Sequence, residues 1–167
     1  KHFRKVVPVE NKAAGGAFDP VTKADRGAEK AIVQALAAKM PNDGVIGEEF
    51  GTKAGTSPYQ WVIDPIDGTR SFIIGSPLWG TLIGVLRDAK PFFGLMDQPF
   101  TGERFGSGDR ASYHSVGGGR PQRLKTRPCA NLEDAVLAST HPDLFEGDMQ
   151  IAALNRVKAM ARLTRYG

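Results

Sequence analysis

Apolar residues recur at helical spacing in two segments of the chain. The first follows Thr22-Lys23-Ala24-Asp25, and its stripe consists of Ala28, Ile32, Ala35 or Leu36, and Met40. This pattern predicts an amphipathic helix that ends at Pro41. A second long helix is predicted from Met149 to Leu163, with its apolar side formed by Ile151, Leu154, Val157 and Met160 or Ala161.

Between these helices, β-prone runs alternate with turn residues. Strands are predicted at Val45–Gly47, Trp61–Ile63, Trp79–Leu86, Pro91–Met96, Glu103–Phe105 and Ala135–Ser139. Residues 87–90 form a turn that joins two of these strands as a hairpin, whereas composition predicts loops at 51–58 and 106–119. Helices beside a mainly antiparallel sheet indicate a layered α+β domain.

The length and composition bound the class of protein. At 167 residues and 41% hydrophobic content, the chain is long enough for one domain, or for one domain and part of another. Its longest apolar stretches, such as residues 82–86, are too short to span a membrane, and no export leader is visible. The single cysteine, Cys129, excludes an internal disulfide framework and fits a reducing compartment. We therefore expect a soluble cytoplasmic protein without a membrane partner.

Positive charge is concentrated in one part of the chain. The net charge is +4, and Arg120, Arg123, Lys125 and Arg127 lie close together in the sequence. Such a cluster is compatible with a surface for an anionic partner. It lacks interleaved aromatic residues, so we favour a solvated loop and expect no nucleic-acid partner.

The segment with the most chemical information is an apolar run that ends in two carboxylates. Asp64 directly follows this run, Pro65 cannot extend a backbone ladder, and Asp67 lies three residues beyond Asp64. Both carboxylates can therefore converge on a hard divalent cation. Gly68 and Thr69 add backbone N–H groups at a turn where a helix is predicted to begin. The N-terminus of a helix binds phosphate oxygens well. Asp-Pro and Asp-Gly are also ordinary turn dipeptides, but a carboxylate that leaves a buried strand needs a cation or hydrogen-bond donors.

Residues 64–69, Asp-Pro-Ile-Asp-Gly-Thr, resemble the signature of the inositol monophosphatase superfamily of magnesium-dependent, lithium-sensitive phosphatases. Gly47-Glu48-Glu49 resembles the segment that carries the glutamate metal ligand of that family. Residues 19–25, Asp-Pro-Val-Thr-Lys-Ala-Asp, are similar to its water-positioning segment. The segments that resemble the histidinol-phosphatase branch more than the inositol branch are residues 70–73, 77–84 and 97–104. The resemblance thus runs nearly the length of the chain.

The resemblance implies a centre of two magnesium ions, or three, held by oxygen ligands. Asp64 would bridge two ions, and Glu48 and the Ile66 carbonyl would complete one of the two sites. Asp67 would hold the other ion together with an aspartate that does not lie within this sequence. Thr69, with Glu48, would orient and deprotonate the attacking water.

The same resemblance implies a substrate site in which Asp67 and the backbone N–H groups of Gly68 and Thr69 hold the phosphate. Three further residues have an ordinary interpretation beside the implied one. Asp25 would position water through a further metal ion, but Thr22 and Asp25 also form a capping box at the predicted helix start. Lys12 would lie near the metal cluster or on the plain surface. Arg70 would contact the phosphate or a polar group of the substrate, or be a solvated residue in the first turn of a helix.

The implied fold is an alternating α/β/α/β/α sandwich, here mainly its N-terminal part. Residues 1–130 would form the metal- and phosphate-binding domain and residues 131–167 the start of a second domain, so that the chain is expected to be a piece of a longer protein. The implied activity is hydrolysis of L-histidinol phosphate by a metal-activated water in a homodimeric enzyme of histidine biosynthesis. Myo-inositol monophosphate is the alternative substrate. A hypothesis of another class is a fragment that binds metal and phosphate without catalysis.

Overall fold

The computed structural model describes residues 2–6, 8–12, 20–108 and 110–167. Its chain divides into two compact units, Lys1–Leu124 and Lys125–Gly167, each of which we describe by itself. Within the described residues, no helix is long and apolar enough to cross a membrane.

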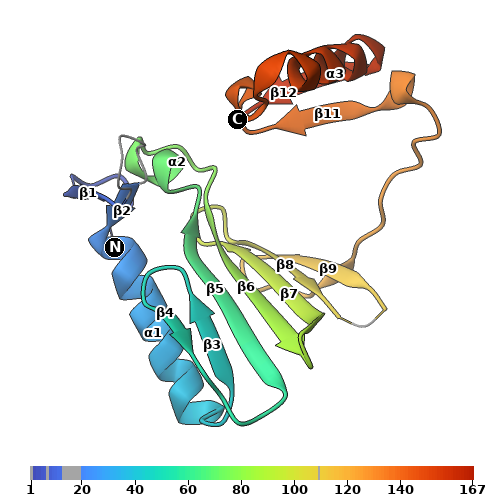
Figure 1. The fold of residues 1–167 in the computed structure, drawn as a ribbon. Helices are drawn as coiled ribbons and strands as arrows, with labels where there is room; N and C mark the ends of the chain where they lie inside the picture. The colour runs from blue at the N-terminus through green and yellow to red at the C-terminus, as the bar shows by residue number, and fades with distance from the viewer. Residues whose placement is uncertain (1, 7, 13–19, 109) are drawn as a thin grey trace. The chain divides into compact units, whose positions relative to one another are not determined.

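The first unit is built on an eight-stranded sheet with the order β10-β9-β8-β7-β6-β5-β3-β4 (Figure 1). Its strands are β3 (Gly44–Gly47), β4 (Gly51–Lys53), β5 (Tyr59–Asp67), β6 (Gly80–Arg87), β7 (Lys90–Gln98), β8 (Glu103–Ser107), β9 (Ser112–Val116) and β10 (Gln122–Arg123). Strands β3 and β5 pair in parallel, and the other neighbours pair antiparallel. A separate antiparallel pair is formed by β1 (Val9–Asn11) and β2 (Pro20–Thr22). The predicted α+β class with a mainly antiparallel sheet is confirmed.

Helix α1 (Lys23–Lys39) packs against β5 and lies along one face of the sheet (Figure 1). Its last residue is Lys39 and its C-cap is Met40, immediately before Pro41, where the sequence predicts the helix to end. The most deeply buried polar positions on it are the carboxylates of Asp25 and Glu29, at 2% and 0% exposure, whereas Ala28, Ile32 and Leu36 are half-buried and Ala35 and Met40 are exposed. The predicted helix is therefore correct, but its innermost face carries acids as well as apolar residues.

Strand β5 is longer than the predicted segment and contains Pro65. Its pairing with β6 runs in register as far as Asp64 and is interrupted before Asp67. Thr81 of β6 donates its hydroxyl to the Pro65 carbonyl at 2.9 Å in this interrupted part. Proline has no N–H group to donate, and the Thr81 hydroxyl satisfies the Pro65 carbonyl where the ladder is interrupted.

Two segments predicted as loops contain strands. Strand β4 lies within the predicted loop 51–58 and pairs with β3, so that prediction is wrong for residues 51–53. Strand β9 lies within the predicted loop 106–119 and pairs with β8. Its His114 ring stacks on Phe105 at a centroid distance of 4.4 Å. Both strands gain hydrogen bonds from a neighbour. Strand β4 is only three residues long, and β9 is a short segment between glycine-rich and polar residues, so both gave little local signal for a strand.

The second unit is a β-α-β arrangement. Strands β11 (Val136–Ser139) and β12 (Leu163–Tyr166) pair in parallel, and helix α3 (Gly147–Met160) connects them. Two 3₁₀ turns complete the unit, η1 (Leu132–Asp134) and η2 (Pro142–Leu144). The predicted helix extends too far, because Leu163 pairs with Val136 in the sheet and takes no part in α3.

Candidate active site

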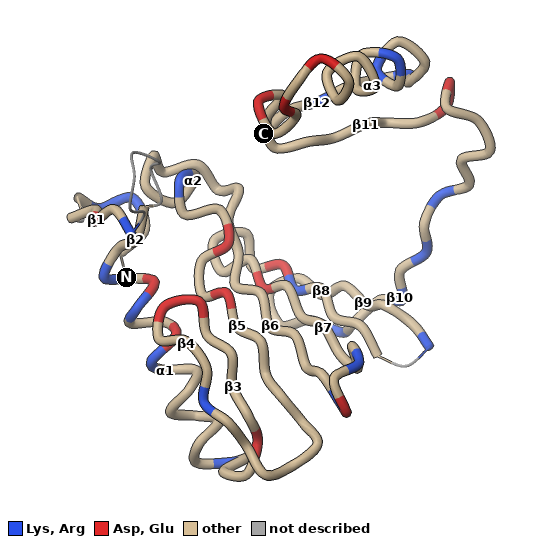
Figure 2. The backbone as a smooth tube through the Cα atoms, viewed as in Figure 1, with Lys and Arg blue, Asp and Glu red and all other residues tan. Residues whose placement is uncertain are grey.

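The parallel pairing of β3 with β5 places Glu48 beside Asp64. Gly47 lies opposite Ile63, and the N–H group of Glu48 donates to the Ile63 carbonyl at 3.2 Å. Glu48 and Asp64 are therefore the next residues along the two parallel segments, Glu48 directly after β3 and Asp64 within β5. They also line a common pocket of about 350 Å³, together with Ile46, Gly47, Val62, Ile63, Leu82 and Gly84. The acidic positions at the ends of β3 and β5 are visible in Figure 2.

The surroundings of Asp64 disfavour its charged form. Its Oδ1 atom is buried and has no hydrogen-bond partner among the described residues. Burial, followed by the hydrogen bond and charge of Glu48 and the charge of Asp67, raises the pKa of Asp64 from an ordinary 3.8 to about 7. The N–H group of Ile66 acts in the opposite direction by hydrogen bonding to the carboxylate. A carboxylate in these surroundings is stabilised by a proton or by a cation.

The donor atoms fit a hard divalent cation. Glu48, Asp64 and Asp67 supply carboxylate oxygens, and Ile66 supplies a carbonyl oxygen, which are the ligand types that Mg²⁺ prefers. Asp67 is exposed at the end of β5. In the part of the chain that the structure describes, no three His, Cys, Asp or Glu side chains converge as closely as a finished metal centre requires.

Lys12 joins the two glutamates of the turn between β3 and β4. Its Nζ atom lies 3.0 Å from Glu48 Oε1 and 2.6 Å from Glu49 Oε1. Burial lowers the pKa of Lys12, but the hydrogen bonds and charges of Glu49 and Glu48 outweigh burial and hold the pKa above its ordinary value. The Glu49 side chain is only 2% exposed and also lies 3.9 Å from Arg26 Nε. Lys12 thus forms ion pairs with both Glu48 and Glu49, and the Glu49 side chain is buried.

Asp25 has two contacts that match its two interpretations. Its Oδ2 atom accepts from the Thr22 N–H group at 2.9 Å and from the Thr22 hydroxyl at 2.5 Å, which completes the capping box of α1. Its Oδ1 atom lies 3.5 Å from the Thr69 hydroxyl. One oxygen therefore caps the helix while the other faces the turn after β5. Asp19, in the same predicted water-positioning segment, lies outside the described residues.

The turn after β5 requires glycine at position 68. Gly68 has φ of +83° and precedes the short helix α2 (Thr69–Ile73). A Cβ atom at this position would lie 2.8 Å from the Leu78 carbonyl oxygen, so only glycine fits without strain. The Thr69 hydroxyl donates to the Ile66 carbonyl at 3.0 Å, and Arg70 is exposed in the first turn of α2.

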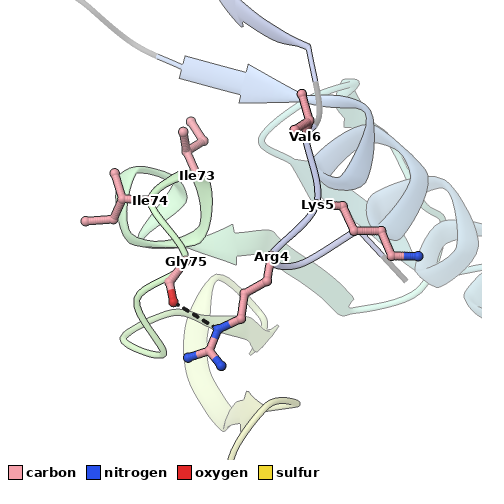
Figure 3. Close-up of a pocket in the computed structure, with 6 residues that line it drawn as sticks. All are labelled: Arg4, Lys5, Val6, Ile73, Ile74 and Gly75. Carbon is pink, nitrogen blue, oxygen red and sulfur yellow. Dashed lines mark hydrogen bonds between the residues drawn. The ribbon is translucent and has the colours of Figure 1, made fainter.

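A second pocket, of about 630 Å³, lies beside α2 and contains none of the predicted site residues. Figure 3 shows its lining of Arg4, Lys5, Val6, Ile73, Ile74 and Gly75. The Arg4 guanidinium donates to the Gly75 carbonyl at 3.2 Å and lies 4.5 Å from the Phe100 ring centroid. The described residues that line this pocket include no carboxylate and so offer no acidic ligand for a divalent cation.

Glu29 is the acidic residue near the site that the sequence analysis missed. It is fully buried, and its two oxygens accept from the backbone N–H groups of Glu49 at 2.7 Å and Phe50 at 3.1 Å. A signal was present in the sequence, because Glu29 follows Asp25 by four residues and precedes Ile32 by three. This spacing puts all three on one face of α1.

Comparison with known proteins gives the family. The model of the inositol monophosphatase family matches residues 1–167. The chain belongs to the inositol monophosphatase family. It is 39% identical to the chloroplastic bifunctional phosphatase IMPL2 of Arabidopsis thaliana, over 100% of this chain and 46% of the relative. It is 42% identical to a histidinol-phosphatase of Mycobacterium tuberculosis, over 71% of this chain and 46% of the relative.

A solved structure supports the same family at the level of the fold. An inositol monophosphatase from Zymomonas mobilis is 36% identical and superposes with a TM-score of 0.78, over 99% of this chain and 60% of that protein. The chain spans about half the length of the curated relatives above. The predicted membership of the inositol monophosphatase family and the α+β fold are therefore confirmed.

The raised pKa of Asp64 predicts how the stability of the metal-free protein depends on pH. The pKa is higher in the folded protein than the ordinary 3.8, so the folded state binds the proton more tightly. The contribution of Asp64 is fully present below the unfolded pKa and is lost as pH rises through about 7. In EDTA, we expect the difference in melting temperature between wild type and Asp64→Asn to shift in favour of the variant from pH 5 to pH 8. An unchanged difference would contradict the raised pKa of Asp64.

Proposed function

We propose that the complete protein is a magnesium-dependent phosphomonoesterase that hydrolyses L-histidinol phosphate to L-histidinol and phosphate. The observation that carries this proposal is the shared pocket of Glu48 and Asp64, in which a buried Asp64 oxygen lacks a partner among the described residues. The inositol monophosphatase family is metal-dependent, generally with Mg²⁺, which agrees with this donor set.

Each residue of the site has a proposed task. Glu48, Asp64, Asp67 and the Ile66 carbonyl would hold two magnesium ions, or three. Bound Mg²⁺ supplies Lewis-acid chemistry, because it acidifies water and neutralises charge on the phosphoryl group. Thr69, together with Glu48, would take the proton of the attacking water. The contact between Thr69 and Asp25 supports a part for Asp25 in orienting that hydroxyl.

The substrate side of the site combines charge and backbone donors. The N–H groups of Gly68 and Thr69 would donate to the phosphate, and Arg70 would offer a planar donor fork beside it. Asp67 would help to position the phosphate through the cation that it holds. Lys12 would lie close to the bound ions, because it already contacts Glu48. Such fixed donors act on the charge that develops during phosphoryl transfer.

Histidinol phosphate is the first substrate because of two similarities. The chain resembles the histidinol-phosphatase branch at residues 70–73, 77–84 and 97–104. The Mycobacterium tuberculosis relative is also named a histidinol-phosphatase. The Zymomonas mobilis structure is that of an inositol monophosphatase, which keeps inositol 1-phosphate as the second candidate. A cytoplasmic homodimer in histidine biosynthesis completes the proposal.

The test is phosphate release by the complete protein in Mg²⁺, with L-histidinol phosphate compared with myo-inositol 1-phosphate. We expect a strong preference for histidinol phosphate that is lost in Asp67→Asn. Preference for the inositol ester would overturn the substrate and keep the reaction class. Absence of Mg²⁺-dependent release from either ester would instead favour a protein that binds metal and phosphate without catalysis.

A further inference from the structure

Glu29 is a buried carboxylate whose contacts lie next to a proposed metal ligand. It is 0% exposed, and neither the capping box nor the hydrophobic core requires an acid at this position. Burying a carboxylate is costly unless hydrogen bonds compensate for the lost water. The compensation here comes from two backbone N–H groups, those of Glu49 and Phe50. Both oxygens of Glu29 are therefore hydrogen bonded to the turn that carries Glu48.

This turn is fixed by three successive backbone N–H groups. The N–H group of Glu48 donates to the Ile63 carbonyl of β5 at 3.2 Å. Those of Glu49 and Phe50 donate to Glu29 Oε2 at 2.7 Å and to Glu29 Oε1 at 3.1 Å. The backbone of the turn is thus held between β5 on one side and α1 on the other. The position of the Glu48 side chain depends on both attachments.

Gly47 makes room for this arrangement. A Cβ atom at position 47 would lie 1.8 Å from Glu29 Oε1 and 2.5 Å from the carboxyl carbon. The carboxylate passes over Gly47 to reach the two N–H groups, and a methyl group there would force it out of the hydrogen bonds. The φ angle of Gly47 is not positive, so backbone conformation does not require glycine here. The close approach of the Glu29 carboxylate does.

The same helix face also reaches the second part of the site. Asp25 lies one turn before Glu29 on α1, and its Oδ1 atom faces the Thr69 hydroxyl. Glu29 therefore contacts the turn that carries Glu48, and Asp25 contacts Thr69 in the turn after β5. Residues that hold metal ligands in place typically change metal affinity by about 10–100-fold when they are replaced.

We propose that Glu29 is a positioning residue that sets the reach of Glu48 toward Asp64 and thereby the affinity of the site for Mg²⁺. The proposal rests on the proposed function, because Glu48 must be a metal ligand for Glu29 to act through it. Glu29 would act through the backbone of Glu49 and Phe50, to which it is hydrogen bonded. In Glu29→Gln, an amide NH₂ group would replace one accepting oxygen and face a backbone N–H group, which loosens the turn.

The test is calorimetric titration of the complete, metal-free protein with Mg²⁺ in the absence of substrate. We expect Glu29→Gln to raise the Kd for Mg²⁺ by roughly tenfold or more. Gly47→Ala should raise it similarly by displacing the carboxylate, and the double variant should add little beyond either change. At saturating Mg²⁺, the KM of Glu29→Gln for the phosphate ester should stay near that of wild type.

Asp43→Asn is the matched control, because Asp43 also holds a loop by two bonds. It accepts from the Ser57 hydroxyl at 2.5 Å and from Trp61 Nε1 at 2.8 Å, at the end of β3 opposite Glu48. This variant should lower the melting temperature and leave the Kd for Mg²⁺ unchanged. An unchanged Kd in folded Glu29→Gln and Gly47→Ala, or an equal rise in Asp43→Asn, would overturn the proposal. Failure of wild type to bind Mg²⁺ would instead overturn the proposed function, and Gly47→Ala decides the matter if Glu29→Gln does not fold.

Discussion

Asp64→Asn is expected to reduce Mg²⁺-dependent phosphate release by on the order of 10³-fold or more. Asp64 is the carboxylate with a buried, unpartnered oxygen among the described residues, and it shares a pocket with Glu48. Loss of a charged ligand removes several kcal/mol of charge stabilisation from a metal-assisted reaction, and each ~1.4 kcal/mol corresponds to tenfold in rate. The measurement is initial-rate phosphate release at saturating Mg²⁺ and substrate.

The same variant should not be less stable than wild type without metal. Asparagine has nearly the same shape as Asp64 and removes the charge that burial and Glu48 disfavour. Thermal unfolding in EDTA at pH 8 should therefore give an equal or higher melting temperature for Asp64→Asn. Glu103→Gln is the control, because Glu103 pairs with His114 at 3.1 Å and lies outside the site; its phosphate release should stay near wild type. Retention of more than about a tenth of the activity in Asp64→Asn would contradict the metal assignment.

Asp25→Asn is expected to lower phosphate release by about 10²–10⁴-fold, the range for losing the proton transfer whose hydroxyl Asp25 would orient. The physical reason is the position of Oδ1, 3.5 Å from the Thr69 hydroxyl. An asparagine has one oxygen and an NH₂ group, so it cannot keep both Thr22 bonds and also present a charged accepting oxygen to the Thr69 hydroxyl. The measurement is the maximal rate at saturating Mg²⁺, together with the free energy of unfolding.

Thr22→Ala separates catalysis from helix capping at Asp25. It removes the hydroxyl that accepts from the Ala24 N–H group at 3.1 Å and donates to Asp25 Oδ2, but leaves Oδ1 in place. Loss of a cap costs about 1 kcal/mol, so both variants should lose similar stability. We expect only Asp25→Asn to lose activity strongly. If activity falls in parallel in the two variants, capping alone explains Asp25.

The elements that the sequence predicted correctly have strong local patterns. Helix α1 combines a capping box, an apolar stripe and Pro41, so its limits are determined by nearby residues. The hairpin of β6 and β7 has two long β-prone runs around a short turn. Strands β4 and β9 were missed because both are short, lie among turn-forming residues and take their hydrogen bonds from β3 and β8.

The candidate site follows a similar division. Asp64 and Asp67 are recognisable in the sequence because charged residues directly after an apolar run need partners. A position of Lys12 near the metal cluster was expected only by resemblance, and its contacts with Glu48 and Glu49, 36 and 37 positions away, come from the tertiary structure. Glu29 was missed because an acid on a helix is usually solvated, and its burial depends on the absence of a side chain at Gly47.

The sequence by itself determined the α+β class, the family, the main helix and hairpin, and the oxygen donors of the candidate site, because these depend on residue type and on short-range spacing. Only the tertiary structure decided which donors meet. The parallel register of β3 with β5 placed Glu48 beside Asp64, and the packing of α1 against β5 brought Asp25 to Thr69 and Glu29 to the Glu48 turn. These pairs join residues that are far apart in the chain. Strand register and close packing set the distances between their side chains, and local sequence preferences do not.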